Sequence, residues 1–133
     1  MMENDNNELV RAATAVRENA YAPFSEFKVG AALETDDGQI IVGSNVESAS
    51  YGLTVCAERV AVWNAISQGK RKIKRIAVVA DTEDLTPPCG VCRQIIWEFG
   101  GDIPVIFANL HGKVDTVQMK ELLPRAFDTK FLK

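Results

Sequence analysis

The sequence is poor in the features that mark secreted, membrane-spanning or nucleic-acid-binding proteins. Its 133 residues include only three cysteines and one histidine. An odd and small number of cysteines argues against a framework of structural disulfides. No apolar run approaches the roughly 20 residues of a membrane helix, and a net charge of −3 gives no general attraction to nucleic acid or anionic lipid. We therefore expect neither a membrane nor a nucleic acid as a partner.

Basic residues gather in only one place, the stretch KRKIKR at 70–75. It follows Gly69, which is suited to end a helix, and precedes the apolar run IAVVA, so a solvated connector is favoured over a nucleic-acid site. The opening residues MMENDNNEL have neither the basic nor the apolar region of a signal peptide, which predicts a cytoplasmic protein. Because 47% of the residues are hydrophobic, positions 1–133 are expected to form a single domain.

Hydrophobic periodicity and turn residues predict alternating helices and strands. Apolar residues at helical spacing after Asn6 or Asn7 indicate an opening helix that stops near Asn19. Thr54 and Gly69 are suited to cap the start and the end of a second helix. The other expected elements are a β-hairpin over 27–43, a strand at 75–81, a helix at 89–99, strands at 103–109 and 113–117, and a short helix within 116–123. This order predicts an α/β fold with three layers, α/β/α, around a mixed five-stranded sheet.

The three cysteines lie where two helices are expected to begin. Cys56 falls in the first turn of the second helix, whereas Cys89 and Cys92 open the third, three residues apart and so on one face. The N–H groups and the dipole at a helix start favour thiolates. Three thiolates leave one tetrahedral position of a zinc ion open to water, as in catalytic sites. The pattern predicts Zn²⁺ as a cofactor, although each cysteine taken alone fits a buried structural role equally well.

Two charged residues beside Cys56 suit such a site. Arg59 lies one turn beyond Cys56, so it can donate to the sulfurs and offset the negative charge of three thiolates. Glu58 can reach over the open position and move protons to and from an activated water. On an isolated helix both would be solvated surface charges, and the neighbouring thiols favour the roles at the metal.

Several separated motifs now point to one family. A C-x-E stretch and a later P-C-x-x-C stretch, both at helix starts, are the signature of zinc-dependent deaminases. Over residues 19–127 the chain resembles cytidine deaminase of the small, homotetrameric type. The motifs that carry the resemblance are YAPFSEFKVGAAL, NVESASY, CAER, PCGVCRQ and ELLPRAF. The resemblance implies a cytidine deaminase-like fold and a homotetramer with shared active sites. Pro87 and Ser48 depart from the residues that are usual in the family, at the rim of the site.

The resemblance assigns a role to each residue of these motifs. It implies that Glu58 shuttles protons and that Gln94 joins Arg59 near the sulfurs of the zinc ligands Cys56, Cys89 and Cys92. The residues that it assigns to the substrate are Asn45 and Glu47 for the ribose hydroxyls, Phe27 and the backbone of Ala57 for the base, and Tyr51 and Phe127 from neighbouring subunits. Without the resemblance, Phe27 would fit core packing equally well, and the loop residues Asn45 and Glu47 would be expected in solvent.

The expected function is hydrolytic deamination of cytidine and deoxycytidine to the uridine compounds, with release of ammonia, in pyrimidine salvage. The first alternative is deamination of a related cytosine compound such as blasticidin S. A zinc-binding interaction module would need a fourth ligand, and His111 sits in an expected turn with Gly112, away from the cysteine segments. A redox C-x-x-C protein would leave the pairing of Cys56 with Glu58 unexplained. We expect Trp63 and Trp97 to lie in the core or at a subunit interface.

Overall fold

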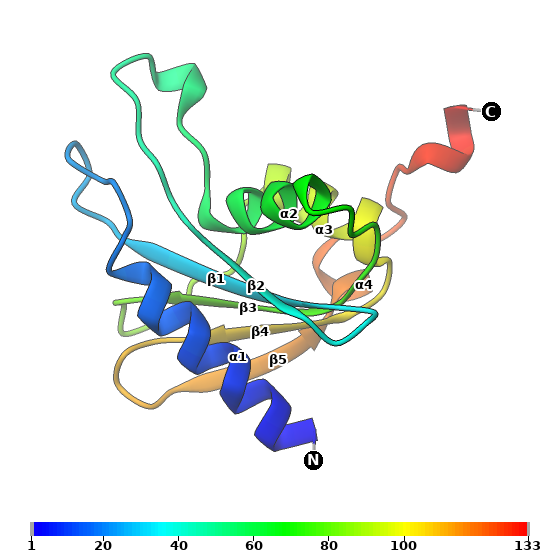
Figure 1. Ribbon diagram of the computed structural model, residues 1–133, viewed down its shortest axis with the longest axis horizontal. Helices are drawn as coiled ribbons and strands as arrows, with labels where there is room; N and C mark the ends of the chain where they lie inside the picture. The colour runs from blue at the N-terminus through cyan, green and yellow to red at the C-terminus, as the bar shows by residue number, and fades with distance from the viewer. Residues whose placement is uncertain (1, 133) are drawn as a thin grey trace.

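The chain folds around a mixed five-stranded sheet with helices on both faces (Figure 1). The computed structural model describes residues 2–132. In chain order the elements are α1 (Met2–Arg17), β1 (Val29–Thr35), β2 (Ile40–Ser44), η1 (Tyr51–Leu53), α2 (Ala57–Ser67), β3 (Ile73–Ala80), α3 (Gly90–Gly100), β4 (Pro104–Ala108), β5 (Val114–Gln118), α4 (Met119–Leu122) and η2 (Thr129–Leu132). The strand order is β2-β1-β3-β4-β5, with β3 and β4 parallel and the other neighbours antiparallel.

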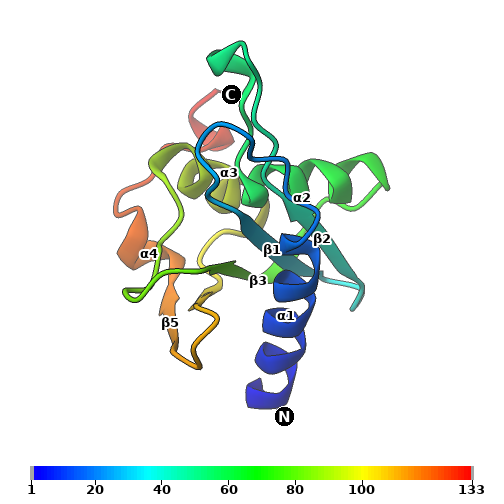
Figure 2. The same cartoon turned by 90° about the vertical axis from the view of Figure 1, so that its left-hand side faces the viewer.

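Helix α1 covers one face of the sheet alone (Figures 1 and 2). Its periodic apolar residues Leu9 and Ala13 are fully buried. They pack in a cluster with the strand residues Ala32, Ala77, Val79, Ile106 and Ala108. The end of the helix is tied to the start of β1, because Nε of Arg17 donates to the carbonyl oxygen of Lys28 at 3.1 Å.

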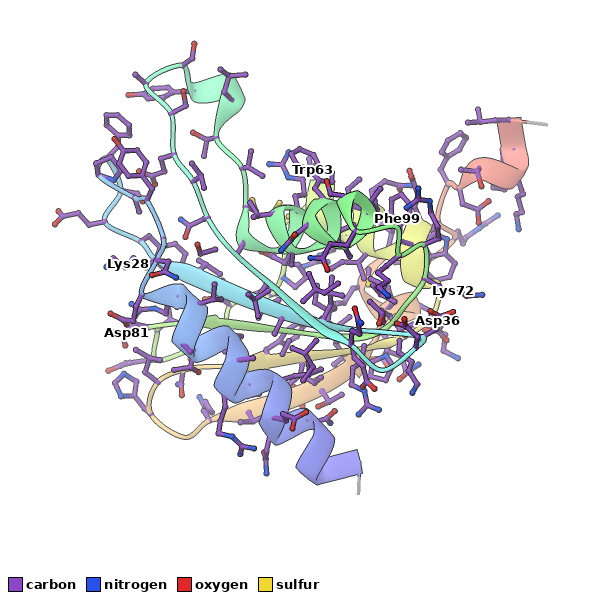
Figure 3. All side chains as sticks on the ribbon, in the orientation of Figure 1. Lys28, Asp36, Trp63, Lys72, Asp81 and Phe99 are labelled. Carbon is purple, nitrogen blue, oxygen red and sulfur yellow. The ribbon has the colours of Figure 1, made fainter. Side chains whose placement is uncertain are left out.

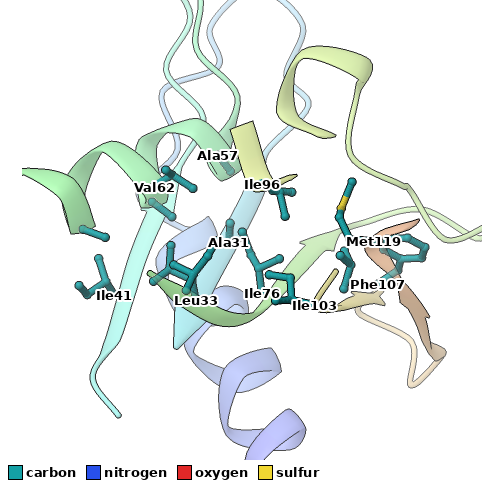
Figure 4. Packing of buried hydrophobic residues seen from close by; sticks show 14 residues of the cluster. Ala31, Leu33, Ile41, Ala57, Val62, Ile76, Ile96, Ile103, Phe107 and Met119 are labelled. Atoms are coloured by element: carbon teal, nitrogen blue, oxygen red, sulfur yellow. The ribbon is translucent and has the colours of Figure 1, made fainter. Parts of the chain in front are cut away.

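The opposite face carries α2, α3 and α4 and the larger core cluster (Figure 4). Ala31 and Leu33 of β1 point to this side, whereas Ala32 points to α1, as the two-residue period of a strand requires. Ile76 of β3 and Ile96 of α3 lie in the same cluster and are fully buried. Layers on both faces of a mixed sheet confirm the predicted three-layer α/β/α architecture.

Two glycines let the helices come close to the sheet. A Cβ atom on Gly30 would lie 2.0 Å from the carbonyl oxygen of Ala13 in α1. A Cβ atom on Gly43 would lie 2.3 Å from the backbone nitrogen of Ala61 in α2. Neither helix backbone can yield as a flexible side chain would, so these contacts fix α1 and α2 at short range. The position of α2 matters for function, because Cys56 immediately precedes it.

The predicted helix ends are partly wrong. Helix α1 begins at Met2, upstream of Asn6 and Asn7, and ends at Arg17 rather than near Asn19. The reason is that asparagine inside a helix costs less than about 1 kcal/mol relative to alanine, which the packing of the apolar stripe readily offsets. Part of the segment expected to be helical within 116–123 extends β5 to Gln118, and only one helical turn, α4, follows.

The start of α2 also differs from the prediction. Thr54 follows η1 and does not cap α2, whereas Cys56 takes the extended N-cap conformation at φ −71° and ψ 154°. The end is as predicted, because Gly69 has φ +88° just beyond the last turn. Cys89 occupies the equivalent N-cap position of α3 at φ −68° and ψ 168°. The two cysteines thus precede their helices in the same backbone conformation.

The basic run at 70–75 is used in ion pairs rather than presented as a patch. Lys70 pairs with Asp37 of the β1–β2 turn at 2.7 Å. Arg75 lies inside β3, is buried, and pairs through Nε with Glu34 of β1 at 2.8 Å. The predicted connector is therefore shorter than expected, since Ile73 already belongs to β3. Within residues 2–132, every helix is too short or too polar to cross a bilayer.

Candidate metal centre and active site

The starts of α2 and α3 bring the three cysteines together. Cys56 and Cys89 precede the two helices, and Cys92 lies in the first turn of α3. The sulfur atoms are 3.8 Å apart between Cys56 and Cys89 and 3.4 Å apart between Cys89 and Cys92. All three sulfurs lie within 4.8 Å of one another. The predicted convergence of the three thiols is confirmed.

The cluster fits a zinc ion with one open position. Zinc–sulfur bonds of about 2.3 Å at tetrahedral angles place two sulfur ligands about 3.8 Å apart, close to the separations in the cluster. Within residues 2–132, the group of potential ligands contains these three cysteines and no histidine or carboxylate. Three ligands are the number found in catalytic zinc sites, whereas a closed structural site needs four. The residues could therefore hold zinc and leave room for water.

The surroundings of Cys56 favour a thiolate. Hydrogen bonds from the Cys92 thiol, from Arg59 and from Cys89 lower the pKa of Cys56 to about 5, against a smaller opposing effect of burial. The hydrogen bond to Cys56, followed by burial, raises the pKa of Cys92, which acts as the proton donor to Cys56. A site with one ready thiolate is suited to take up a divalent cation and to release the remaining thiol protons as it binds.

Arg59 reaches back to the sulfur cluster from the first turn of α2. Its Nη2 lies 3.8 Å from the sulfur of Cys56 and 3.4 Å from the carbonyl oxygen of Thr54. The guanidinium group also stacks over Trp63, with 5.8 Å from its carbon to the ring centre. Trp63 lies on the outer side of α2, away from the sheet, and is half exposed (Figure 3). The arginine is thus fixed where it can compensate thiolate charge, as the spacing predicts.

Glu58 is buried beside the cysteines, with 4% of its surface exposed. Burial is the main cause that raises its pKa to about 7, and the charge of Cys56 adds to the effect. A carboxyl group with a pKa near neutrality is well matched to taking up and returning a proton. The glutamate therefore differs from the solvated charge expected of this position on an isolated helix.

A cavity of about 180 Å³ joins these residues to the predicted base contacts. Its walls come from the β1 start, the loop before α2, β3 and the loop before α3. The lining residues are Phe27, Val29, Asn45, Thr54, Val55, Cys56, Ala57, Glu58, Val78, Thr86, Pro87 and Cys89. The cavity thus brings together two of the three cysteines with the predicted substrate contacts Phe27, Asn45 and Ala57. It is also lined by Val29, Val78 and Thr86, which no sequence pattern marked as site residues. The cavity has the apolar wall and few polar groups of a small-molecule site.

Asn45 has a structural task within this cavity. Its Oδ1 accepts a hydrogen bond from the backbone N–H of Val29 at 2.8 Å, and its Nδ2 donates to the carbonyl oxygen of Phe27 at 2.8 Å. The buried amide therefore holds the strand that carries Phe27. One N–H of Nδ2 remains for another acceptor, so the predicted contact with a ribose hydroxyl is compatible with this geometry and stays a prediction.

A second hollow of about 420 Å³ adjoins the first and shares Thr54 with it. Glu47 and Tyr51 line it, together with Phe24, Ser25 and Ser48. The Glu47 carboxylate accepts hydrogen bonds from the loop that contains Phe24 and Ser25, and the Ser25 hydroxyl bond is the main cause of its lowered pKa. Tyr51, at the tip of its loop, is 81% exposed.

Phe127 and Gln94 lie together, outside both hollows. Nε2 of Gln94 donates to the carbonyl oxygen of Phe127 at 2.8 Å and to Glu98 at 3.2 Å. The Phe127 ring is 56% exposed and stacks on Phe131, with 5.5 Å between ring centres. The Gln94 amide thus holds the C-terminal segment on α3, and its predicted place beside the sulfurs stays a prediction. An exposed ring next to the C-terminus is free to contact another chain.

His111 is remote from the cysteine cluster. Its Nε2 pairs with Asp81 at 3.0 Å, and Asp81 lies just beyond the end of β3 (Figure 3). Its backbone N–H donates to the side chain of Asn109. His111 is not a member of the potential metal group among the described residues, as the sequence predicts.

Comparison with known proteins shows the family to which the chain belongs. Residues 3–108 match the family model of the cytidine and deoxycytidylate deaminase zinc-binding region. The chain belongs to this family. It is 50% identical over 124 residues to a cytidine deaminase of Halalkalibacterium halodurans, covering 92% of this chain and 94% of the relative. It is 33% identical over 125 residues, 88% of each chain, to a blasticidin-S deaminase of Bacillus cereus.

Solved structures show the same fold. The crystal structure of cytidine deaminase from Burkholderia pseudomallei superposes with a TM-score of 0.88 at 48% identity, covering 91% of this chain and 98% of the other. The cytidine deaminase from Mycobacterium tuberculosis superposes with a TM-score of 0.80 at 40% identity, covering 92% and 97%. These likenesses confirm the α/β fold, and the family assignment together with the three sulfurs supports zinc as the cofactor.

Proposed function

We propose that this protein deaminates cytidine and deoxycytidine hydrolytically to uridine and deoxyuridine, with release of ammonia, in pyrimidine salvage. The observation that carries the proposal is the buried Glu58 in one cavity with Cys56, Cys89, Phe27 and Asn45. The closely similar cytidine deaminases of this family support the choice of substrate. A lower identity to the blasticidin-S deaminase gives no reason to prefer that substrate.

The residues divide the chemistry among them. Cys56, Cys89 and Cys92 would hold the zinc ion, which when bound would supply Lewis-acid activation of a water molecule. Glu58 accepts one proton from the attacking water, whose oxygen adds to C4 of the cytosine ring, and delivers it to N3. It then moves the proton of the new C4 hydroxyl to the amine, so that the C4–N bond breaks, ammonia leaves and the C4 carbonyl of uridine remains. Burial keeps the pKa of Glu58 near 7, so the group can both accept and donate at neutral pH.

The remaining cavity residues orient the nucleoside. Phe27 contacts the pyrimidine ring, and the backbone of Ala57 hydrogen-bonds the base. Asn45 and Glu47 bind ribose hydroxyls, with Glu47 accepting from the 3′-hydroxyl. A 3′-phosphate would offer no proton and would meet the Glu47 carboxylate with like-charge repulsion. The enzyme should therefore accept free nucleosides and reject 3′-nucleotides and single-stranded nucleic acid.

We further propose a homotetramer in which Tyr51 and Phe127 complete a neighbour's active site. Both rings are exposed, and each stands beside other exposed apolar side chains: Leu53 follows Tyr51 in η1, and Phe131 stacks on Phe127. Exposed apolar side chains gathered in this way are typical of surfaces that another chain covers. Light scattering should give a mass four times the 14.6 kDa of one chain. A fully active monomer would contradict the proposal.

We also propose that residues 1–133 act as one domain in the cytoplasm. The support for a single domain is that both helical layers pack on one sheet. Cell fractionation should recover the activity with the cytosolic proteins.

The direct test of the reaction is ultraviolet absorbance during incubation of zinc-loaded protein with substrate. Deoxycytidine should lose its amine and release ammonia in equal amount. Deoxycytidine 3′-monophosphate and a short cytosine oligomer should remain unchanged, and blasticidin S serves as the competing substrate. Efficient deamination of the oligomer, or of blasticidin S in preference to deoxycytidine, would refute the proposed function.

A further inference from the structure

Ser25 stands out because its hydroxyl is bonded on both sides. Its Oγ donates to Oε2 of Glu47 in a short hydrogen bond and accepts from the backbone N–H of Phe27 at 3.0 Å. The bond from Phe27 occupies a lone pair of the hydroxyl oxygen, so it fixes the direction in which the hydrogen points. That hydrogen is directed at the carboxylate. A serine in the loop before β1 is thereby joined to a glutamate in the loop before α2.

The same loop supplies two more donors to the glutamate. The backbone N–H groups of Phe24 and Ser25 donate to Oε1 of Glu47 at 2.9 Å and 3.1 Å. The two backbones are also paired directly, because the N–H of Glu47 donates to the carbonyl oxygen of Tyr21 at 2.8 Å. The orientation of the carboxylate is thus set by the loop at 21–27 and not by solvent.

The Glu47 carboxylate has one hydrogen-bond acceptor site that no group of residues 2–132 occupies. An ionised carboxylate offers about four lone-pair sites, two on each oxygen. Both sites on Oε1 are taken by backbone N–H groups, and one site on Oε2 is taken by Ser25. A single acceptor site on Oε2 remains, in the hollow that Glu47 shares with Tyr51 and Thr54. Such a site accepts one hydroxyl proton and has nothing to offer an ether or a phosphate ester.

We infer that Ser25 is a positioning residue that orients Glu47 so that one carboxylate acceptor site selects a nucleoside with a free sugar hydroxyl. This inference rests on the proposed function, because it takes Glu47 to contact the sugar. Ser25 itself need not touch the substrate. Its loss would leave Oε2 without a fixed partner, so the carboxylate would be held only through the two backbone bonds to Oε1, and the preorganisation of Oε2 for the hydroxyl would be weakened.

The test compares two nucleosides that differ only in the hydroxyl at issue. Zinc-loaded wild type, Ser25→Ala, Ser25→Thr and the control Ser67→Ala, an exposed serine at the end of α2, are assayed with 2′-deoxycytidine and 2′,3′-dideoxycytidine. Ser25→Ala should raise KM for deoxycytidine about tenfold, as expected for loss of an aligned hydrogen bond to a charged group. Its kcat, and its KM for the dideoxynucleoside, should stay within about twofold of wild type. Ser25→Thr and Ser67→Ala should keep the wild-type values.

The sugar comparison separates positioning from a merely structural role. If Ser25→Ala raised KM equally for both nucleosides, the serine would only hold the loop, and the inference would be overturned. An unchanged KM for deoxycytidine in Ser25→Ala would overturn it as well. In both cases the wild type would still deaminate deoxycytidine, whereas a wild type without deaminase activity would refute the proposed function itself.

Discussion

The metal centre and the sugar-side rim of the same site are built in different ways. The metal centre lies at two helix starts that are anchored on the sheet, and its proposed ligands and proton carrier all come from one chain. The rim comes from the loops at 21–27 and 45–55, where Tyr51 is largely exposed. In the proposed homotetramer the C-terminal segment of another copy adds Phe127, whose ring is also exposed. In the proposed function, the reacting groups therefore lie at the ends of regular helices, whereas the residues that select the substrate lie on loops held by hydrogen bonds or by another chain.

Removal of a metal ligand should have the largest effect and should be confined to the metal centre. Cys92→Ala leaves two thiols, so zinc content should fall below about one-tenth of an ion per chain and deamination should disappear. Val91→Ala, on the exposed neighbour in α3, should retain one zinc per chain. Elemental analysis of both variants decides the point. Full zinc and activity in Cys92→Ala would show that the ligands are elsewhere.

Two glycines test whether the metal side is the more rigid region. In Gly43→Ala the new methyl group would collide with the backbone of α2, so the variant should lose about 3 kcal/mol of unfolding free energy. In Gly52→Ala, within η1 of the rim, the methyl group meets no atom within 4 Å, and the loss should stay below about 0.5 kcal/mol. Urea unfolding monitored by tryptophan fluorescence measures both. Equal losses would erase the proposed contrast between the regions.

Arg59 tests how much the metal centre depends on charge compensation. Arg59→Ala should keep zinc but lower kcat about tenfold, because the sulfur ligands would hold the metal with their negative charge unrelieved. The control is Arg71→Ala. The Arg71 guanidinium donates to the backbone carbonyl oxygens of Ile66 and Lys70, remote from the sulfur cluster. Steady-state kinetics with parallel zinc analysis distinguishes the two. An unchanged kcat in Arg59→Ala would reduce the arginine to packing on Trp63.

The rim should give the smallest effect on turnover and none on the metal. Tyr51→Ala should lower kcat/KM by about threefold to tenfold with full zinc content, because only one aromatic contact of the neighbour's site is lost. Leu53→Ala, at a residue that is also exposed in η1, should change kcat/KM by less than about twofold. Loss of zinc from Tyr51→Ala would contradict the separation of rim and metal centre.

The same contrast explains what the sequence could predict. Cysteines three residues apart at a helix start, and an arginine one turn after Cys56, are local patterns, so the pairing of Cys89 with Cys92 and the contact of Arg59 with Cys56 followed from spacing. The approach of Cys56 to Cys89 spans 33 residues and depends on how α2 and α3 pack. The N-cap residue of α2 did not follow from spacing, because threonine is a better N-cap than cysteine by composition and only the preceding η1 turn excludes Thr54. The contacts between the two loops of the rim could not be predicted from the sequence either. The bonds that join Ser25 to Glu47 span 22 residues of sequence and leave no periodic signal.

The proposed reaction depends most directly on Glu58, the buried carboxylate beside the three cysteines, which is proposed to carry the protons of deamination. Glu58→Gln keeps the shape of the side chain but cannot take up a proton, so zinc content and kcat should be measured on the same preparation. We predict one zinc per chain and a kcat for deoxycytidine at least about a hundredfold below wild type. A zinc-loaded Glu58→Gln protein with near-wild-type turnover would contradict the account.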